Sequence, residues 1–561
     1  MALNRARLAT WLPFLGWPRP DRATLRGEIM AGLTVAMLVL PQGVAYAALA
    51  GMPLVTGIYA SFIPALVGVL FSASARLSVG PTALTSLLIG ASLGPLAVPG
   101  GADWVSLAVW LALMSGALQL LMGAMRFGWL LKLVNSPVLI GFTQGASVLI
   151  ALSQLPALLG FTGRPMAQWL TGPPPDWTAM AFGLCTMAIL WTAKQRWPRL
   201  PAAMLVVGLG AVVSAALGYA LQGGAVIGAL PTGLPAPYLP GAISLQTFGA
   251  LLLPALMITL VSFLETASSA KVDNGRSGKL WNENQDLIGQ GLAKIASGLC
   301  GAFATSSSFS RSAINLYAGA KTGWATIVCV VLIGVALLWL MPLLYHVPQA
   351  VLAGLVVTAI LGLVRPAAFV ALWRVSRIEA GTAMATFALT IATAPAIYWG
   401  VLAGLAMSLS HYMYRHLHPR IIEVGLHPDG RLRDRHLWHL PPLREDVCAL
   451  RMDAELDFAS ASTLERAVAE QLAAHPAIGT LCLFAQPINR IDITGAEVFG
   501  SIRQSVETRG LSLWVIGLKL PAQTVLEKAG LLTPGPMLRV FGTDAEALAA
   551  LAKPTTPSAE A

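Results

Sequence analysis

The stretch from Leu38 to Leu88 reads LVLPQGVAYAALAGMPLVTGIYASFIPALVGVLFSASARLSVGPTALTSLL, and it decides the fold. Arg76 is its one charged residue, so the stretch is too apolar and too long for the core of a soluble protein. Pro41 and the run from Ser78 to Pro81 lie inside membrane-length segments. Proline and glycine break helices at bilayer depth, where broken backbone is tolerated only around a protein-enclosed site. The stretch therefore predicts a polytopic membrane protein with a central site.

The composition of the whole chain supports this prediction. Of its 561 residues, 56% are hydrophobic and 11% are charged, against about 25% charged in ordinary soluble domains. Nine acidic residues occur up to Tyr414, and the remaining quarter of the chain holds the other seventeen. We therefore expect a membrane part that ends near Tyr414 and a soluble part after it. The net charge of +10 lies mostly in short loops, which argues against a nucleic-acid partner.

The spacing of cysteine and histidine residues gives no sign of a metal site. Five cysteines are scattered without a CxxC pair, and a histidine group at His411, His416 and His418 fits a solvated juxtamembrane cluster better than a metal centre. The sequence also lacks a nucleophile constellation. We expect no metal, no cofactor and no enzymatic activity.

Hydropathy predicts about fourteen helical segments in the membrane part. Segments three and ten are too short to cross about 30 Å of hydrocarbon at 1.5 Å per residue. The segments are 31–49, 54–71, 82–93, 104–122, 137–155, 179–193, 202–221, 248–270, 287–303, 311–319, 325–344, 349–363, 380–393 and 396–412.

The two short segments stand at matching positions of two seven-segment halves. Such a pair points to an inverted-repeat transporter and to its site. Each short helix would begin near the midplane, where its free N–H groups and the positive end of its dipole attract an anion. The pattern predicts a 7+7 inverted repeat around an anion site.

Lysine and arginine residues predict the orientation. By the positive-inside rule, the side that holds the basic N-terminal segment and the even-numbered connections is cytoplasmic, and so are both termini. The opposite side has only Arg164. The cations on the cytoplasmic side are Arg5, Arg7, Arg19, Arg22, Arg26, Arg76, Arg126, Lys132, Lys194, Arg196, Arg199, Lys271, Arg276, Lys279, Lys321, Arg365, Arg374 and Arg377.

Three motifs in order, LPQGVAYA, GIYASFIPALVGVLF and LSVGPTAL, resemble the signature region of the SulP sulfate-permease family of anion transporters. The resemblance covers nearly the whole chain. It implies a uracil-permease-like architecture with a core domain (segments 1–4 and 8–11) and a gate domain (segments 5–7 and 12–14). It also implies a homodimer in the inner (plasma) membrane, in which the core moves against the gate in an elevator-type cycle.

Arg311 opens segment ten in the run TSSSFSRSAINL. A guanidinium at bilayer depth is costly and normally faces a cavity or a partner, and here it adds a full charge to the dipole of the short helix. The alternative is an arginine that snorkels or forms a structural pair. In the SulP family the matching serine and arginine border the central anion, so the resemblance makes Ser310 and Arg311 binding candidates.

Gln42 and Tyr46 lie one helical turn apart and share a face, so both side chains could line one cavity. The resemblance implies that these positions flank the substrate. Thr82 begins the other short helix and matches a further site position of the family. For Tyr46 and Thr82 the alternative is ordinary helix packing.

Glu265 is the one carboxylate in the middle of a predicted segment. A carboxyl group there suits binding of a proton in one state and its release in another, and the resemblance assigns this position to the coupling ion. Ser262 and Thr266 supply nearby hydroxyl groups. Because a carboxylate with hydroxyls also coordinates Na⁺, sodium coupling stays open. A structural ion pair of Glu265 with Arg311 stays open too.

The C-terminal part alternates apolar strand-like runs with amphipathic helical patterns, which predicts an α/β domain. It resembles a STAS domain, the module shared with anti-sigma-factor antagonists. The run from Asp492 to Gly495 matches that module's loop before a helix, so Thr494 is a phosphorylation candidate. The alternative is a helix N-cap.

The predicted domains are a cytoplasmic N-terminal segment (1–28), a transport domain (29–414), a linker (415–446), a STAS domain (447–552) and a disordered tail (553–561). The predicted function is secondary active transport of a small anion (sulfate, bicarbonate or a dicarboxylate), coupled to protons. The alternatives are a sodium-coupled bicarbonate carrier, an uncoupled channel or exchanger, and a membrane-anchored sensor. The STAS domain is expected to bind a cytoplasmic regulator.

Overall fold

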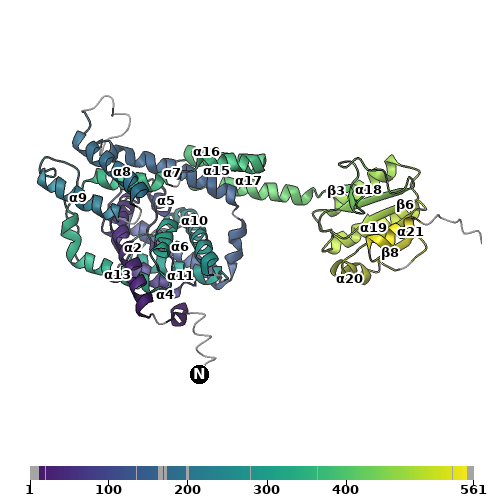
Figure 1. Ribbon diagram of the computed structural model, residues 1–561, viewed down its shortest axis with the longest axis horizontal. Coiled ribbons are helices and arrows are strands. Elements are labelled where there is room, and N and C mark those ends of the chain that lie inside the picture. Colours follow the sequence, from purple (N-terminus) through teal and green to yellow (C-terminus); the bar gives the residue numbers. More distant parts are fainter. Residues whose placement is uncertain are drawn as a thin grey trace, which may run out of the picture. The chain divides into compact units, whose positions relative to one another are not determined.

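The computed structural model describes residues 12–18, 21–133, 135–161, 169, 174–197, 201–277, 280–362, 364–533 and 535–552. The predicted tail 553–561 and residues 1–11, 19 and 20 of the predicted N-terminal segment lie outside these ranges. So do six residues of the predicted charge pattern: Arg5, Arg7, Arg19, Arg164, Arg199 and Lys279. The chain divides into two units, which meet between Ser408 and Leu409 (Figure 1).

The first unit is built from helices. They are α2 (Arg22–Leu49), α3 (Thr56–Tyr59), α4 (Ile63–Phe71), α5 (Ala83–Leu93), α6 (Ala102–Ala124), α7 (Ser136–Leu158), α8 (Trp177–Arg196), α9 (Ala202–Ala216), α10 (Leu245–Ser277), α11 (Glu283–Leu299), α12 (Phe309–Tyr317), α13 (Trp324–Val335), α14 (Gln349–Leu361), α15 (Pro366–Val375), α16 (Arg377–Ala392) and α17 (Tyr398–Leu417). The last of these runs across the division. Short 3-10 or π segments lie at Pro13–Gly16, Phe127–Leu133, Ala336–Leu340 and Met341–Leu344.

A helix occupies each of the fourteen predicted apolar segments. The segment 54–71 is broken into α3 and α4, because Pro64 in the first turn of α4 has no N–H group to continue a helix from α3. The predicted end of the segment 202–221 also differs, since α9 ends at Ala216. Helix α15 was not predicted, although its sequence PAAFVALWRV is apolar; it has only ten residues and none of them is buried.

The surface of the first unit is that of a membrane protein. Among the described residues, six helices are long and apolar enough to cross a membrane. Large apolar side chains such as Leu205, Leu209 and Val212 of α9 are exposed, as expected where lipid replaces water. The six helices are Thr24–Leu49, Ala102–Ala124, Ser136–Leu158, Leu245–Ala270, Trp324–Leu344 and Gln349–Val375.

The helices pack as two sets. In one set α11 packs against α4 and α6, α13 against α2, and α10 against α5 and α6. In the other set α7 packs against α14 and α16, and α8 against α9 and α14. Gly43 of α2 and Gly57 of α3 allow one close approach, because a Cβ atom on Gly57 would lie 1.8 Å from the Gly43 carbonyl oxygen. The buried core of the unit joins both sets.

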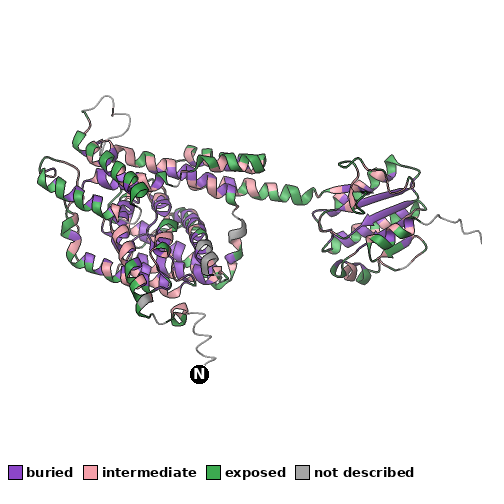
Figure 2. Cartoon of the chain, viewed as in Figure 1, coloured by how far each residue is buried: buried purple, intermediate pink, exposed green. Residues whose placement is uncertain are grey.

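The second unit contains a six-stranded sheet in the order β4-β3-β5-β6-β7-β8. Strands β5 to β8 are parallel, and β3 is antiparallel to both β4 and β5. Figure 2 shows the central strands buried between helices. The elements are β3 (Ile421–Leu426), β4 (Leu432–Asp434), β5 (Val447–Met452), α18 (Ala461–Ala474), β6 (Thr480–Phe484), α19 (Ile493–Thr508), β7 (Ser512–Ile516), α20 (Leu520–Lys528), β8 (Leu538–Phe541) and α21 (Asp544–Leu551).

The predicted linker 415–446 is not a plain linker. Its strand β3 pairs Ile421 with Met452 of β5, and its strand β4 completes the edge of the sheet. The sequence pattern did not identify these strands, because Glu423 and Gly425 interrupt the apolar run of β3 and β4 has only three residues. The α/β domain therefore begins before the predicted limit at Val447.

Candidate functional site

Two short helices begin at one point inside the first unit. Helix α5 follows the two-residue strand β1 (Val79–Gly80), and α12 follows β2 (Ser306–Ser307). The two strands pair in an antiparallel ladder, Val79 opposite Ser307 and Gly80 opposite Ser306. The starts of α5 and α12 are therefore joined by backbone hydrogen bonds, although more than 200 residues separate them in the sequence.

Hydroxyl groups cap both helix starts. Thr82 Oγ1 accepts a hydrogen bond from the Thr85 amide at 3.4 Å, and Ser308 Oγ accepts one from the Arg311 amide at 3.5 Å. The caps satisfy only some of the free N–H groups that open a helix. Two positive dipole ends thus meet at the ladder, which favours an anion there.

Arg311 places a full positive charge at this junction. Its side chain is buried, with 1% of its surface exposed. Nη1 donates to the Pro81 carbonyl at 2.9 Å and Nε donates to Ser78 Oγ at 3.3 Å, so the guanidinium spans from α12 to the start of α5. Nη2 is buried and has no hydrogen-bond partner among the described residues. A buried guanidinium N–H without a partner is suited to an anion oxygen.

Glu265 of α10 faces the start of α5. Its Oε2 atom accepts a hydrogen bond from Thr82 Oγ1 at 3.0 Å and lies 3.5 Å from Thr85 Oγ1. The residue is half-buried and interacts electrostatically with Arg311. Among the described residues it forms no ion pair, so the structural pair with Arg311 that the sequence left open is not formed.

Tyr46 and Gln42 approach the junction from α2. Tyr46 is buried and lies within electrostatic range of both Arg311 and Glu265. Gln42 is buried one helical turn earlier, and its amide oxygen has no hydrogen-bond partner among the described residues. Helix α2 packs against α5 and α12, and the electrostatic interactions of Tyr46 place its ring near the helix starts.

Ser310 differs from the other predicted binding residues. It is exposed, and its hydroxyl oxygen lies 3.4 Å from that of Ser308. Arg311, the next residue, is on the buried face of α12. Adjacent residues of a helix point in different directions, so the serine and the arginine of the predicted pair do not face the same surroundings.

The three predicted coupling-ion residues do not converge on one point. Ser262 Oγ accepts hydrogen bonds from Lys294 Nζ and, at 3.4 Å, from Gln119 Nε2. Thr266 Oγ1 donates to the Ser262 carbonyl oxygen at 2.8 Å, within the same helix. Glu265 is instead bonded to the hydroxyl of Thr82 on α5.

Lys294 is the residue that the sequence analysis missed. It lies in the middle of α11 with no exposed surface, and its Nζ atom donates to Gln119 Oε1 and Ser262 Oγ. A lysine in the middle of an apolar segment is a signal of function by itself, as Glu265 was. The signal in the sequence is the single charge in the run GQGLAKIASGL, inside the predicted segment 287–303.

Comparison with known proteins identifies the chain. Residues 25–386 match the model of the sulfate permease family, and residues 442–547 match the STAS domain. The family match spans more than half of the chain. The chain belongs to the sulfate permease family.

Relatives in this family match along nearly the whole chain. The chloroplastic sulfate transporter 4.1 of Arabidopsis thaliana is 29% identical over 94% of this chain and 81% of its own length. A probable sulfate transporter of Mycobacterium tuberculosis (strain ATCC 25618 / H37Rv) is 30% identical over 93% of this chain and 95% of its own length. The predicted resemblance to the SulP family is thereby confirmed.

Solved structures confirm the fold. The murine Slc26a9 anion transporter in its inward-facing state has a TM-score of 0.86 at 18% identity, over 97% of this chain and 94% of that chain. The transmembrane domain of the cyanobacterial bicarbonate transporter BicA has a TM-score of 0.59 at 21% identity, over 70% of this chain and 99% of that chain. The predicted helical membrane domain with a C-terminal α/β STAS domain is therefore correct.

In this sulfate permease family member, Thr494 lies on the surface of the STAS domain. It is exposed in the first turn of α19. The N-cap of α19 is Asp492, whose Oδ1 atom accepts a hydrogen bond from the Gly495 amide at 2.8 Å. The alternative expectation, that Thr494 itself is the N-cap, is wrong, because the N-cap lies two residues earlier at Asp492.

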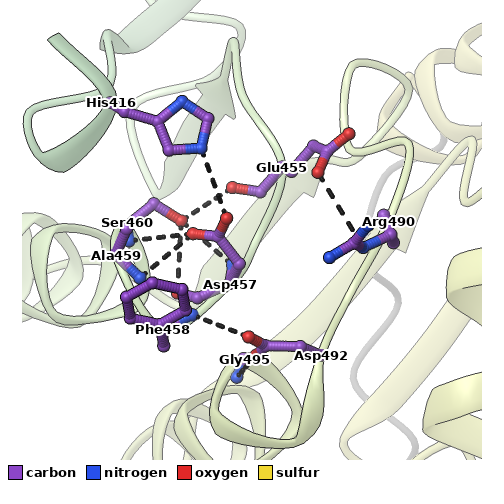
Figure 3. A network of polar contacts seen from close by, with 9 residues as sticks. All are labelled: His416, Glu455, Asp457, Phe458, Ala459, Ser460, Arg490, Asp492 and Gly495. Atoms are coloured by element: carbon purple, nitrogen blue, oxygen red, sulfur yellow. Dashed lines mark hydrogen bonds and ion pairs between the residues drawn. The ribbon is translucent and has the colours of Figure 1, made fainter. Parts of the chain in front are cut away.

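The loop from Glu455 to Ser460 connects Asp492 to the end of α17. Asp492 Oδ2 accepts a hydrogen bond from the Phe458 amide at 2.9 Å, and Asp457 Oδ2 lies 3.4 Å from His416 Nε2. Figure 3 shows His416 on one side of this loop and Asp492 on the other. His416 is thus paired with the STAS domain rather than simply solvated.

Proposed function

We propose that this chain is a secondary active transporter that carries a small anion across the cell membrane. The observation that supports this most directly is the meeting of α5 and α12, with the unpartnered Nη2 atom of Arg311 beside the ladder. Two dipole ends and one guanidinium form an attractive place for an anion. Gln42, Tyr46 and Thr82 complete the proposed binding set, and the exposed Ser310 is left out of it.

Two combinations of substrate charge and Glu265 protonation balance the buried charges around the junction. Arg311 and Lys294 are cations, and Glu265 is an anion when it is ionised. A net charge inside a membrane is costly. A dianion balances the two cations when Glu265 is protonated, whereas a monoanion balances the set when Glu265 is ionised. Relatives named sulfate transporters favour the first combination, so sulfate with one proton is the first candidate.

Glu265 is proposed as the proton-binding group. Its carboxylate contacts Thr82, the residue that caps α5. A change in the protonation of Glu265 would alter the hydrogen bonds at one of the two helix starts, and with them the anion site. This contact gives a direct physical link between the coupling ion and the substrate.

The two sets of helices are proposed to move against each other. The set with α2–α6 and α10–α13 carries every proposed binding and coupling residue, and would be the core. The set with α7–α9, α14, α16 and α17 would be the gate. Elevator-type motion of this core, two inverted seven-span repeats and a homodimer complete the proposal.

The STAS domain is proposed to regulate transport from the cytoplasm, with both termini on that side. Phosphorylation of Thr494 would place negative charge at the N-terminal end of α19, where the helix dipole is favourable. Because Thr494 is exposed, a kinase could reach it without unfolding the domain.

The test is transport by the purified full chain in proteoliposomes. Labelled sulfate, bicarbonate and fumarate would be offered with an imposed proton gradient, sodium gradient or neither. We expect accumulation of sulfate driven by inward protons. Lack of flux for all small anions would refute anion transport. Flux that ignores both gradients would refute coupling, and bicarbonate uptake that needs sodium would favour the sodium-coupled alternative.

A further inference from the structure

Lys294 lies where α6, α10 and α11 meet, within electrostatic range of Glu265. Its Nζ atom extends from α11 to Gln119 Oε1 of α6 and to Ser262 Oγ of α10. The side chain is entirely buried, and it interacts electrostatically with Glu265. Among the described residues, Lys294 forms no direct ion pair with a carboxylate. A buried ammonium without such a pair is costly, and its position therefore needs an explanation beyond packing.

The hydroxyl group of Ser262 has no bonding capacity left for a metal ion. Its hydrogen is donated to the Thr259 carbonyl at 3.2 Å, and its oxygen accepts from Lys294 Nζ and from Gln119 Nε2. A serine hydroxyl offers one hydrogen and two acceptor positions, so all three are used. The Lys294 ammonium takes one of the positions that a cation bound to Ser262 would need.

The carbonyl oxygen of Ser262 is also fully occupied. It accepts the hydroxyl of Thr266 at 2.8 Å and the hydroxyl of Ser306 at 3.3 Å. A sodium ion needs several oxygen ligands around one point, and both oxygens of this residue already have their partners. Of the group Glu265, Ser262 and Thr266, only the Glu265 carboxylate and the Thr266 hydroxyl oxygen retain acceptor positions, which are too few to surround a sodium ion.

We propose that the Lys294 ammonium is a built-in cation that takes the place of a sodium ion beside Glu265. The carrier then works without sodium, because a second cation would meet both electrostatic repulsion and occupied ligands. The proposal deepens the proposed function, since it rests on anion transport with Glu265 as the coupling group. Lys294 acts through Ser262 and Glu265, so it is a positioning residue.

The test compares sodium dependence in full-length variants. Exchange of labelled sulfate across proteoliposomes would be measured in sodium salts and in N-methyl-D-glucamine salts. Lys294→Ala removes the ammonium and frees Ser262 and Gln119, and Lys294→Arg keeps a cation. Gln119→Ala is the matched control, because it removes a partner of Lys294 and leaves the charge. Lys294→Ala combined with Glu265→Gln removes the carboxylate that a sodium ion would need.

We expect the wild-type exchange rate to be the same in both salts within about twofold, well below a tenfold change of 1.4 kcal/mol. Lys294→Ala should exchange sulfate about fivefold to tenfold faster in sodium. In the other three variants the exchange rate should be the same in sodium and in N-methyl-D-glucamine salts, whatever its absolute value. These variants are Lys294→Arg, Gln119→Ala and the double variant. A folded Lys294→Ala protein that ignores sodium overturns the proposal, and so does a wild type that requires sodium.

A second measurement does not depend on transport or on the folding of a variant. Ligands that bind the native state raise the melting temperature. The wild-type protein in detergent should melt at the same temperature in sodium and N-methyl-D-glucamine salts. A rise that is specific to sodium would overturn the role of Lys294, whereas absent anion flux with no such rise would count against the proposed function alone.

Discussion

Replacement of Arg311 by methionine should remove most of the affinity for the anion. The change keeps much of the side-chain volume but deletes the charge and the free Nη2 donor, which lies in a fully buried setting. A hydrogen bond to a charged group contributes about 1.5–3 kcal/mol. The dissociation constant for sulfate should therefore rise by about tenfold to 150-fold.

The same change also removes two structural hydrogen bonds of Arg311, to the Pro81 carbonyl and to Ser78. Some loss of stability is expected, so the melting temperature of the ligand-free protein must be measured beside affinity. Arg311→Lys retains the charge without the two-pronged guanidinium and should lose less affinity. Arg374→Met is the matched control, because Arg374 is exposed on α15 and away from the proposed site.

The assay is isothermal titration of sulfate into purified protein, checked by the sulfate-dependent rise in melting temperature. Binding by a monodisperse Arg311→Met protein that stays within about twofold of the wild type would correspond to less than 0.5 kcal/mol. That result would refute the assignment of Nη2 to the anion. An equal loss of affinity in Arg374→Met would point to a general effect of surface charge instead.

Three further predictions concern coupling, the STAS domain and pH. Glu265→Gln should keep anion exchange but abolish accumulation on a proton gradient, measured in proteoliposomes, because an amide mimics the protonated carboxyl; a variant that still concentrates sulfate would contradict this. Removal of the chain after Leu417, before β3, should lower the transport rate and leave anion selectivity unchanged, and altered selectivity in a well-folded protein would count against the division of roles. Hydrogen bonds from Arg444 lower the pKa of Asp446 in the STAS domain. They therefore stabilise the folded domain fully at pH values above the ordinary pKa of an aspartate, and this stabilisation is lost as the pH falls through the lowered pKa of Asp446. Asp446→Asn should flatten the acid side of the stability profile in urea denaturation followed by proteolysis, and an unchanged profile would exclude this role.

The sequence alone was sufficient to predict the local features. Hydropathy identified the helical segments, because each helix that faces lipid must satisfy its backbone internally and carry apolar side chains. The same logic singled out Arg311 and Glu265, since charges are rare inside such segments. Alternating strand and helix patterns indicated the α/β domain, because its buried strands are continuous apolar runs.

The partners of these residues could not be predicted, because they come from distant parts of the chain. The ladder between Val79 and Ser307 consists of two-residue strands, which are too short for any periodicity to reveal. The contact of Thr82 with Glu265 joins residues that are 183 positions apart. Neither hydropathy nor spacing carries information on which of several polar groups in different helices will meet.

The sequence by itself determined that this chain is a polytopic membrane protein of the sulfate permease family with a C-terminal STAS domain. It also singled out Arg311 and Glu265, although not Lys294, as charges inside the membrane part. The tertiary structure decided how those charges are used. It turned Glu265 toward Thr82 and assigned Ser262 to Lys294. It left Arg311 Nη2 without a partner. The reason is that membrane insertion depends on the composition of each segment, whereas the chemistry of a buried site depends on which side chains the packed helices bring within hydrogen-bonding distance.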